Sequence, residues 1–328
     1  METAAPDSFL TRVGRFLLTP TVGPFIALLL ACIFFSTQTT RFLTTSNFSF
    51  IFQQSVWVGV LAIGQTLIIL TGGIDLSNGA VMSLGAVFMV NLATRNGVNP
   101  FLAIGIGFAI TIGFGLINGV LLTRLRLPPF IVTLGMLNIV FALTLIYTSE
   151  TVVAMPEQTF LGETFKVGPT LITYGSVVMV LLYFLIWFIL RETAFGRHIY
   201  AIGNNREAVR LAGVSTDRLL ISVYALAGLF YGLAALLLVA RSGVGDPQTG
   251  VATNANLESI TAVVLGGTSL FGGRGNVLGT LIGALIVSVF RNGLLLMGYS
   301  SVYQLLITGI LVIVAVSIDQ LSQRGRPR

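Results

Sequence analysis

The chain has 328 residues, of which 55% are hydrophobic and only 9% charged, and its mean hydropathy is +0.93. Soluble domains carry roughly 25% charged residues, so this composition excludes a water-soluble globule. The formal net charge of +6 comes from basic residues that are scattered between apolar segments, and this scatter argues against a nucleic-acid-binding protein.

Ten hydrophobic segments follow one another along the chain and predict membrane-spanning helices. They lie at residues 21–37, 48–71, 79–94, 99–123, 129–148, 171–190, 219–240, 257–267, 276–297 and 301–318. The third and the eighth are shorter than the roughly 20 residues that a straight span requires, and both adjoin glycine clusters. We therefore predict an all-α polytopic membrane protein of about ten transmembrane helices, two of them short or broken, with eight to eleven as the range.

The positions of the basic residues predict the orientation of these helices. With the N-terminus inside and ten crossings, thirteen basic residues lie in inside segments and four in outside segments. This excess obeys the positive-inside rule, so both termini are expected in the cytosol. The predicted organisation is a cytosolic tail at 1–20, one transmembrane domain at 21–318 that includes a cytosolic loop at 191–218, and a cytosolic tail at 319–328.

Two stretches of the sequence, 67–86 and 262–284, echo each other. In each stretch a run of aliphatic residues ends at a glycine pair, and an apolar segment that predicts a helix follows. The pairs are Gly72, Gly73, Gly266 and Gly267. Glycine breaks expose backbone groups that lipid cannot satisfy, so the breaks are expected inside protein or beside a water-filled cavity. Paired short helices in two halves of a chain indicate a transport pathway.

Asp75 follows the first glycine pair directly. An ionised carboxylate in the middle of a bilayer costs about 2.5–3.5 kcal/mol, so the side chain should face a cavity, a partner or an interface. Two interpretations remain open. Asp75 lines the pathway or braces the broken helix through backbone N–H groups, or it caps the third segment near the cytosolic surface.

Glu258 and Arg291 are the other charges near or within the spans. If buried they need partners, either each other or backbone carbonyls, and their roles stay open between substrate contact, helix packing or gating, and snorkelling. Asn78 and Asn292 add neutral hydrogen-bonding groups of the kind that polyols require, although helix–helix contacts use the same groups. Together with Asp75 and the glycine pairs, these residues are the candidate translocation pathway or gate.

The polar loop at 191–218 contains five Arg, the only His and three acidic residues. Within it, residues 205–213 predict a helix of two to three turns that ends at a glycine. The residues expected to carry its contacts are Arg206, Glu207, Ala208, Arg210 and Gly213. Such a helix fits a groove in a soluble partner; the alternative is an ordinary solvated connector.

The sequence contains no Walker A motif, no G-x-S-x-G, no C-x-x-C and no H-E-x-x-H. His198 has no second histidine with which to build a metal site. We therefore expect no enzymatic activity, no metal and no cofactor in this chain.

Five motifs in order along the chain resemble a known family. They are TGGIDLS (71–77), LRLPPFIVTLG (125–135), FGRHIYAIGNN (195–205), EAVRLAG (207–213) and VVLGGTSLFGGRGNVLGTLIGA (263–284). They are similar to the permease subunits of bacterial ABC sugar importers of the ribose/galactose/xylose type, within the branched-chain amino acid permease superfamily. The resemblance runs from about residue 50 to residue 318.

The resemblance implies a type II importer fold in the bacterial inner membrane and a pair of permease copies, expected as a homodimer. It also implies two other partners, a cytosolic ATP-binding subunit that holds ATP and Mg and a periplasmic sugar-binding protein. The ATP-binding subunit would dock on a coupling helix from Glu207 to Gly213. The family pattern E-A-A-x3-G has Val209 at its third position here, which is a mild departure. The implied function is import of a monosaccharide, a pentose or a hexose.

One alternative comes from a different class of protein. A secondary transporter driven by protons or sodium would use Asp75, Glu258 and Arg291 as relay groups, and it would catalyse uptake without partners. A non-transporting membrane scaffold would leave the paired glycine breaks without a role.

Overall fold

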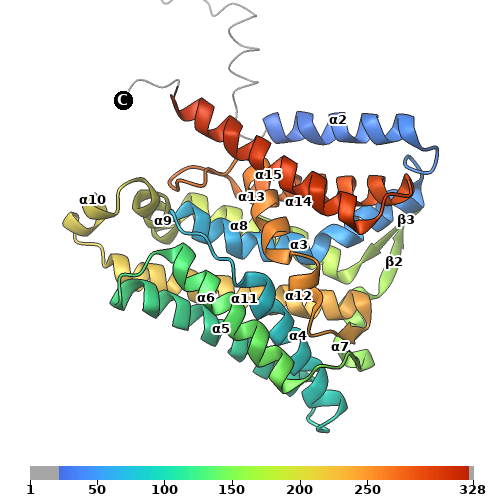
Figure 1. Ribbon diagram of the computed structural model, residues 1–328, viewed down its shortest axis with the longest axis horizontal. Helices are drawn as coiled ribbons and strands as arrows, with labels where there is room; N and C mark the ends of the chain where they lie inside the picture. Colours follow the sequence, from blue (N-terminus) through green and yellow to red (C-terminus); the bar gives the residue numbers. More distant parts are fainter. Residues whose placement is uncertain (1–21, 325–328) are drawn as a thin grey trace, which may run out of the picture.

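The computed structural model describes residues 22–324, and long helices dominate it (Figure 1). Ten of them coincide with the predicted hydrophobic segments. They are α2 (Val22–Gln38), α3 (Thr45–Leu70), α4 (Asn78–Thr94), α5 (Pro100–Arg124), α6 (Pro129–Tyr147), α8 (Tyr174–Glu192), α11 (Thr216–Ser242), α13 (Ala255–Leu265), α14 (Val277–Leu296) and α15 (Ser301–Arg324). The prediction of an all-α polytopic membrane protein is confirmed.

Six helices in the described part of the chain are long and apolar enough to cross a membrane: α3, α5, α6, α8, α11 and α14. The apolar helices α2, α4 and α13 and the apolar part of α15 are shorter. With 17 residues in α4 and 11 in α13, the third and eighth predicted segments are indeed the short ones next to glycine breaks.

The bundle has two distinct ends (Figure 1). One end carries α9 (Ala194–Asn204) and α10 (Arg206–Leu211), which form most of the polar loop, together with the turn between α5 and α6. The other end carries small ordered elements: β1 (Val152–Val153), α7 (Pro156–Thr159), η1 (Phe160–Gly162), β2 (Thr164–Val167), β3 (Thr170–Thr173), β4 (Val244–Gly245) and α12 (Thr249–Ala252). Strands β1 and β4 pair antiparallel, as do β2 and β3. The positive-inside rule makes the first end cytosolic and the second the outer end.

Helix α11 packs against α3, α4 and α5, and its approach to α5 depends on glycines. A Cβ at Gly115 of α5 would strike the backbone carbonyl of Tyr224. A Cβ at Gly228 of α11 would lie 2.5 Å from the carbonyl oxygen of Thr111. Small residues let the two backbones approach closely, which is how helices gain packing energy in lipid.

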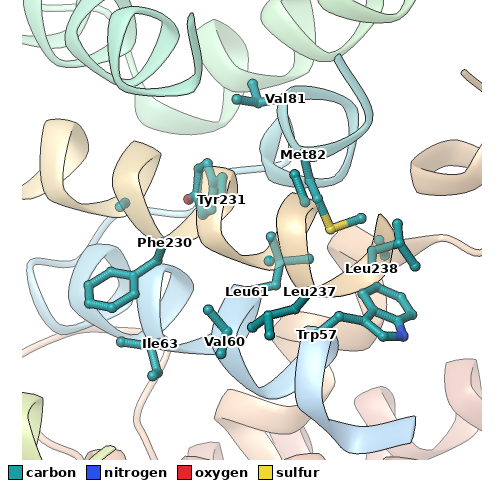
Figure 2. Packing of buried hydrophobic residues seen from close by; sticks show 14 of the residues in the cluster. Trp57, Val60, Leu61, Ile63, Val81, Met82, Phe230, Tyr231, Leu237 and Leu238 are labelled. Atoms are coloured by element: carbon teal, nitrogen blue, oxygen red, sulfur yellow. The ribbon is translucent and has the colours of Figure 1, made fainter. Parts of the chain in front are cut away.

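Side chains from three helices fill the core beside this crossing (Figure 2). Trp57 and Leu61 of α3, Met82 of α4, and Leu237 and Leu238 of α11 belong to one buried cluster. Dense packing of this kind tolerates little displacement. It therefore fixes the ends of α3 and α4 between which the first glycine break is suspended.

Three details differ from the predictions. Helix α9 has eleven residues and was not predicted, because its polar face obscures it in an apolar sequence. Helix α10 has six residues, which is less than two turns, so the predicted length of two to three turns is wrong. Helix α15 continues to Arg324, so the predicted tail at 319–328 is partly helical. The predicted tail at 1–20 and residues 325–328 lie outside the described residues.

Candidate functional site

The first glycine break, residues 71–77, returns into the bundle as a non-helical segment. Gly72 has a φ of +80°, a conformation that glycine adopts without steric cost, and it turns the chain back at the end of α3. The Gly73 N–H donates to a carbonyl of the last turn of α3 at 3.2 Å. Asn78, the first residue of α4, then lies 2.9 Å from the side chain of Gln65. Helix α4 therefore begins inside the fold rather than at its surface.

Neighbouring side chains satisfy the backbone of this segment. Thr133 of α6 donates its hydroxyl to the Ile74 carbonyl at 3.0 Å. The Gln65 amide, with its carbonyl turned toward the segment, accepts from the Asp75 N–H at 3.3 Å and donates to the Asp75 carbonyl at 3.1 Å. Non-helical backbone within a membrane protein is tolerated where protein supplies such partners.

The Asp75 side chain is fully buried and braces the break. Its Oδ1 accepts from the Ser77 N–H at 2.7 Å and from the Ser77 hydroxyl at 2.6 Å, and its Oδ2 accepts from the Tyr231 hydroxyl at 3.1 Å. Asn118 donates to the same Ser77 hydroxyl at 3.1 Å. Because Tyr231 lies near the middle of α11, Asp75 braces the broken helix within the bundle and is not a cap near the cytosolic surface.

Asn78 links three helices at the same depth. Its side-chain amide lies 2.9 Å from the Ser259 hydroxyl of α13 and 2.9 Å from the Gln65 amide of α3. One turn further along α4, the Ser83 hydroxyl accepts from the Gly250 N–H of α12 at 2.7 Å. The first turns of α4 and the chain that leads into α13 therefore meet inside the fold.

The second glycine pair has a different structure. Gly266 and Gly267 follow the last residue of α13, and a loop that extends to residue 276 leads from them into α14. A Cβ at Gly266 would lie 2.5 Å from the carbonyl carbon and oxygen of Gly279, and a Cβ at Gly283 would strike the carbonyl oxygen of Ala262. Helices α13 and α14 thus pack backbone against backbone.

The two glycine regions meet at the cytosolic end. The Gly273 N–H donates to the carbonyl of Leu70, the last residue of α3, at 2.9 Å. Gly203 of α9 packs on both groups, since an added Cβ would strike the Leu70 carbonyl and the Gly273 nitrogen. Tyr200 of the same helix donates its hydroxyl to the Gly275 carbonyl at 3.0 Å. Helix α9 therefore touches both glycine regions directly.

Glu258 and Arg291 pair with each other, one of the arrangements left open by the sequence. Arg291 Nη1 lies 3.3 Å from Glu258 Oε1. The second oxygen of Glu258 has no partner among the described residues. Both side chains line a cavity of about 580 Å³ between α13, α14 and α15. Asn292 is buried on α14, and its Oδ1 likewise finds no partner in the part of the chain described.

The predicted pathway residues thus fall into two groups. Asp75 and Asn78 hold the first break inside the bundle, whereas Glu258 and Arg291 line a cavity. Their assignment to the pathway stays a prediction. Sequence reasoning missed Gln65, whose amide forms hydrogen bonds with the Asp75 backbone in the first glycine break. The available signal was an amide side chain within an otherwise apolar helix.

Helix α10 is short and well capped. The Asn205 side chain accepts from the Ala208 N–H at 2.9 Å, and Gly213 follows the helix with a φ of +85°. Val209, the departure from the family pattern, points into a buried cluster with Leu219 and other residues of α11. The substitution therefore leaves the exposed face of α10 unchanged.

Charges and one apolar side chain cover that exposed face. Glu207 pairs with Arg210 at 2.5 Å, and Arg206 pairs with Asp217 of α11 at 2.9 Å. The hydrogen bond from Arg210 lowers the pKa of the Glu207 carboxyl below its ordinary value, so Glu207 is ionised at neutral pH. Leu211 is 75% exposed and adds an apolar side chain to this charged face.

A cleft of about 930 Å³ lies beside α10, between the α5–α6 turn and the start of α11. Its charged lining consists of Arg124, Arg126, Arg206, Arg210, Arg218, Glu207 and Asp217. With five arginines and two carboxylates, the cleft is electropositive and suits an acidic surface.

Comparison with known proteins places these features in a family. Residues 47–316 match the family model described as "Branched-chain amino acid transport system / permease component". The fructose import permease protein FrcC of Rhizobium meliloti is 45% identical over 326 residues, covering 97% of this chain and 90% of that protein.

Ribose import permeases are similar as well. The protein RbsC of Bacillus subtilis is 40% identical over 91% of this chain and 92% of its own length, and RbsC of Escherichia coli K12 is 38% identical over 91% and 93%. No solved structure matches the chain. The family match covers α3 to most of α15, including both glycine breaks and α10, and the chain therefore belongs to the permease component family of branched-chain amino acid transport systems.

Proposed function

We propose that this chain is the membrane-spanning subunit of an ABC importer that moves a monosaccharide, a pentose or a hexose, into the cytosol. The observation that carries the proposal is similarity to fructose and ribose import permeases over nearly the whole chain. The exposed helix α10 at the cytosolic end supports it.

Three partners follow from this function. A cytosolic ATP-binding subunit, which holds ATP and Mg, docks on α10 and on the basic cleft beside it. A periplasmic sugar-binding protein delivers the sugar to the outer end, where the hairpin of β2 and β3 stands. A second copy of this chain completes the permease pair.

The contacts at the cytosolic end suggest how motion is transmitted. Movement of α10 displaces α9, and Gly203 of α9 lies against Leu70 and Gly273. A shift of α9 therefore acts at once on the end of α3, where the first break begins, and on the loop that follows the second glycine pair. Closely packed interfaces of this kind convert small displacements into a change between discrete arrangements.

The test is reconstitution of the tagged chain in liposomes with its ATP-binding subunit and sugar-binding protein. We expect ATP-dependent uptake of labelled D-fructose or D-ribose, and co-purification of the ATP-binding subunit. Glu207→Lys and Leu211→Asp should abolish both, because they reverse or remove contacts on the exposed face of α10.

Glu192→Lys is the matched control, since Glu192 is also an exposed carboxylate of the polar loop paired with an arginine. It should leave uptake and co-purification intact. Uptake by the chain alone, dependent on a proton or sodium gradient and unaffected by Leu211→Asp, would establish the secondary transporter instead.

A further inference from the structure

A hollow with an apolar lining and a group of polar side chains runs beside the Glu258–Arg291 pair. It combines the cavity of about 580 Å³ between α13, α14 and α15 with a smaller one of about 160 Å³ that α3, α11 and α14 enclose. The residues that line both cavities are Thr253, Glu258, Val287 and Arg291. The ion pair therefore stands where the two cavities adjoin.

The hollow reaches from the outer end to the middle of the bundle. Arg241, the penultimate residue of α11, lines the smaller cavity at the outer end. Trp57, near the middle of α3, lines the same cavity deeper in the fold. An importer receives its cargo from this side, so the hollow lies in the half of the molecule that the sugar enters first.

The lining offers buried acceptors that the protein leaves unpaired and, beside them, arginine donors in addition to the one that Arg291 gives to Glu258. The guanidinium groups of Arg241 and Arg291 supply only donors. Glu258 Oε2 and Gln54 Oε1 are buried acceptors with no partner among the described residues. A buried acceptor left without a hydrogen bond destabilises the protein, and a bound ligand that donates to it recovers this lost free energy.

These groups select the chemical class of the ligand. An anion would meet the Glu258 carboxylate, and a cation would meet two arginines. A hydroxyl group both donates and accepts, so it can bond to the arginines and to the unpaired acceptors together. A neutral polyhydroxylated solute is therefore the ligand that can form hydrogen bonds with all of these polar groups.

Trp57 adds an apolar wall to the same hollow. One face of a furanose or pyranose ring consists of C–H groups, and such a face packs on an aromatic ring. Binding sites for small molecules combine an apolar or aromatic surface with a few placed polar groups in this way. The side chains of Gln54 and Arg241 line the cavity next to the indole.

The inner limit of the hollow is the polar contact between α4 and α13. Ser259, the residue after Glu258, forms a hydrogen bond with the side-chain amide of Asn78, which contacts Gln65. These three side chains are fully buried. A solute held beside Glu258 would have to separate this contact to move further toward the cytosol.

We propose that Gln54, Trp57, Arg241, Glu258 and Arg291 form a transit site that binds the hydroxyl groups of a monosaccharide in the outer half of this permease. The site deepens the proposed function and rests on it. The sequence had singled out only Glu258 and Arg291 of these five residues. The other three come from α3 and α11, and only the fold brings them to the ion pair.

The chain contains two tryptophans, Trp57 and Trp187, so fluorescence can report this site directly. Trp187 stacks under Arg191 at the cytosolic end of α8, away from the hollow. In the reconstituted full complex carrying Trp187→Phe, titration with D-fructose and with D-ribose should change the emission saturably, and this change should disappear when Trp57→Phe is added, which separates the Trp57 signal from that of the partner subunits. The titrations are made with and without a non-hydrolysable ATP analogue, because the nucleotide state sets which side is open. Glycine betaine, a solute without hydroxyl groups, serves as the control.

Gln54→Ala and Glu258→Gln in the same background should raise the half-saturating sugar concentration at least about fivefold, as loss of one hydrogen bond predicts. Asn138→Ala is the matched control, because Asn138 on α6 bonds only to its own helix among the described residues. A response that is absent, not saturable, or unchanged in both variants would overturn the transit site. If that complex still takes up the sugar with ATP, the proposed function stands without the site. If the complex hydrolyses ATP but takes up no sugar, the proposed function itself is refuted.

Discussion

At Gly72 and Gly73 the chain leaves helix α3, and side chains of other helices hold the non-helical segment in place. At Gly266 and Gly267, by contrast, helices α13 and α14 contact each other through their backbones. An added Cβ at Gly72 would meet only the Phe271 carbonyl at 3.7 Å, but one at Gly266 would lie 2.5 Å from the Gly279 backbone. The first region is a buried non-helical segment in which Gly72 itself has space for a Cβ, and the second is a closely packed pair of helices. Two similar glycine-containing sequences thus have different roles: one allows an unusual backbone conformation, and the other allows two helices to approach closely.

The comparison also separates how each region is stabilised. The first break depends on hydrogen bonds from Thr133, Gln65 and Ser77 to its backbone or to Asp75. The second depends on packing between α13 and α14. Polar networks of a few bonds can rearrange as a unit, while close-packed backbones resist displacement. We therefore expect the first region to be the one that moves during transport.

The largest predicted effect distinguishes steric from conformational glycines. Gly266→Leu should force α13 away from α14 and remove most folded protein, because backbone atoms cannot yield as side chains do. Gly72→Leu should cost only about 1–2 kcal/mol, the strain of a positive φ. Size-exclusion profiles and thermal unfolding in detergent measure both. Full transport by both variants would contradict any role of the glycine breaks in the pathway.

A second prediction concerns the side chain that holds the first break. Asp75→Leu leaves the Ser77 N–H, the Ser77 hydroxyl and the Tyr231 hydroxyl without their acceptor. The expected loss of stability is about 3 kcal/mol or more, since each buried unpaired group costs about 1–3 kcal/mol. Asp75→Asn keeps one acceptor oxygen and should lose less than half as much. Equal thermal unfolding of the two variants would show that the network does not support the segment.

The third prediction tests the point where the two regions meet. Gly203→Val should place a side chain against the Leu70 carbonyl and the Gly273 nitrogen, and the short helix α9, which packs on its neighbours less extensively than α13 and α14 pack on each other at Gly266, should move away from both groups without unfolding the bundle. ATP hydrolysis by the complex should persist while sugar uptake falls at least about tenfold, equivalent to about 1.4 kcal/mol. Gly135→Val is the control, because nothing lies within 4 Å of a Cβ at Gly135. Parallel loss of hydrolysis and uptake would argue against a coupling role.

The smallest predicted effect compares two buried tyrosines of α11. Tyr231 donates to Asp75 at 3.1 Å, whereas the Tyr224 hydroxyl has no hydrogen-bond partner among the described residues. Tyr231→Phe should therefore lower stability by about 1 kcal/mol, and Tyr224→Phe should be neutral or slightly stabilising. Thermal unfolding of the two variants under identical conditions decides this. The reverse order would mean that the bond to Asp75 is not part of the bracing network.

Much of the fold could be predicted because its signals are local. Hydrophobic runs of sufficient length predicted the helices, and glycine pairs marked where α3 and α13 end. The stop at Gly213 was likewise readable, since the sequence places a glycine where a left-handed conformation ends α10. Helix α9 was not predicted, because its polar face makes its sequence resemble that of the charged loop around it.

The candidate site was only partly predictable. Asp75, Glu258 and Arg291 stood out because charges are costly among apolar residues. Their partners did not, since a tyrosine on α11 and an amide on α3 look ordinary in an apolar sequence. The residues joined by these contacts are separated by 156 positions for Asp75 and Tyr231, and by 33 for Glu258 and Arg291.

By itself the sequence determined the class of protein, the positions and orientation of its helices, the two breaks and the exposed charge of the α10 region, because each depends on composition over one turn or one span. Only the tertiary structure decided which break is a buried non-helical segment and which is a closely packed pair of helices. From the sequence alone, a glycine shows only that a Cβ is absent. Whether that absence serves a positive φ, as at Gly72, or the approach of another backbone, as at Gly266, depends on what the rest of the chain places beside it.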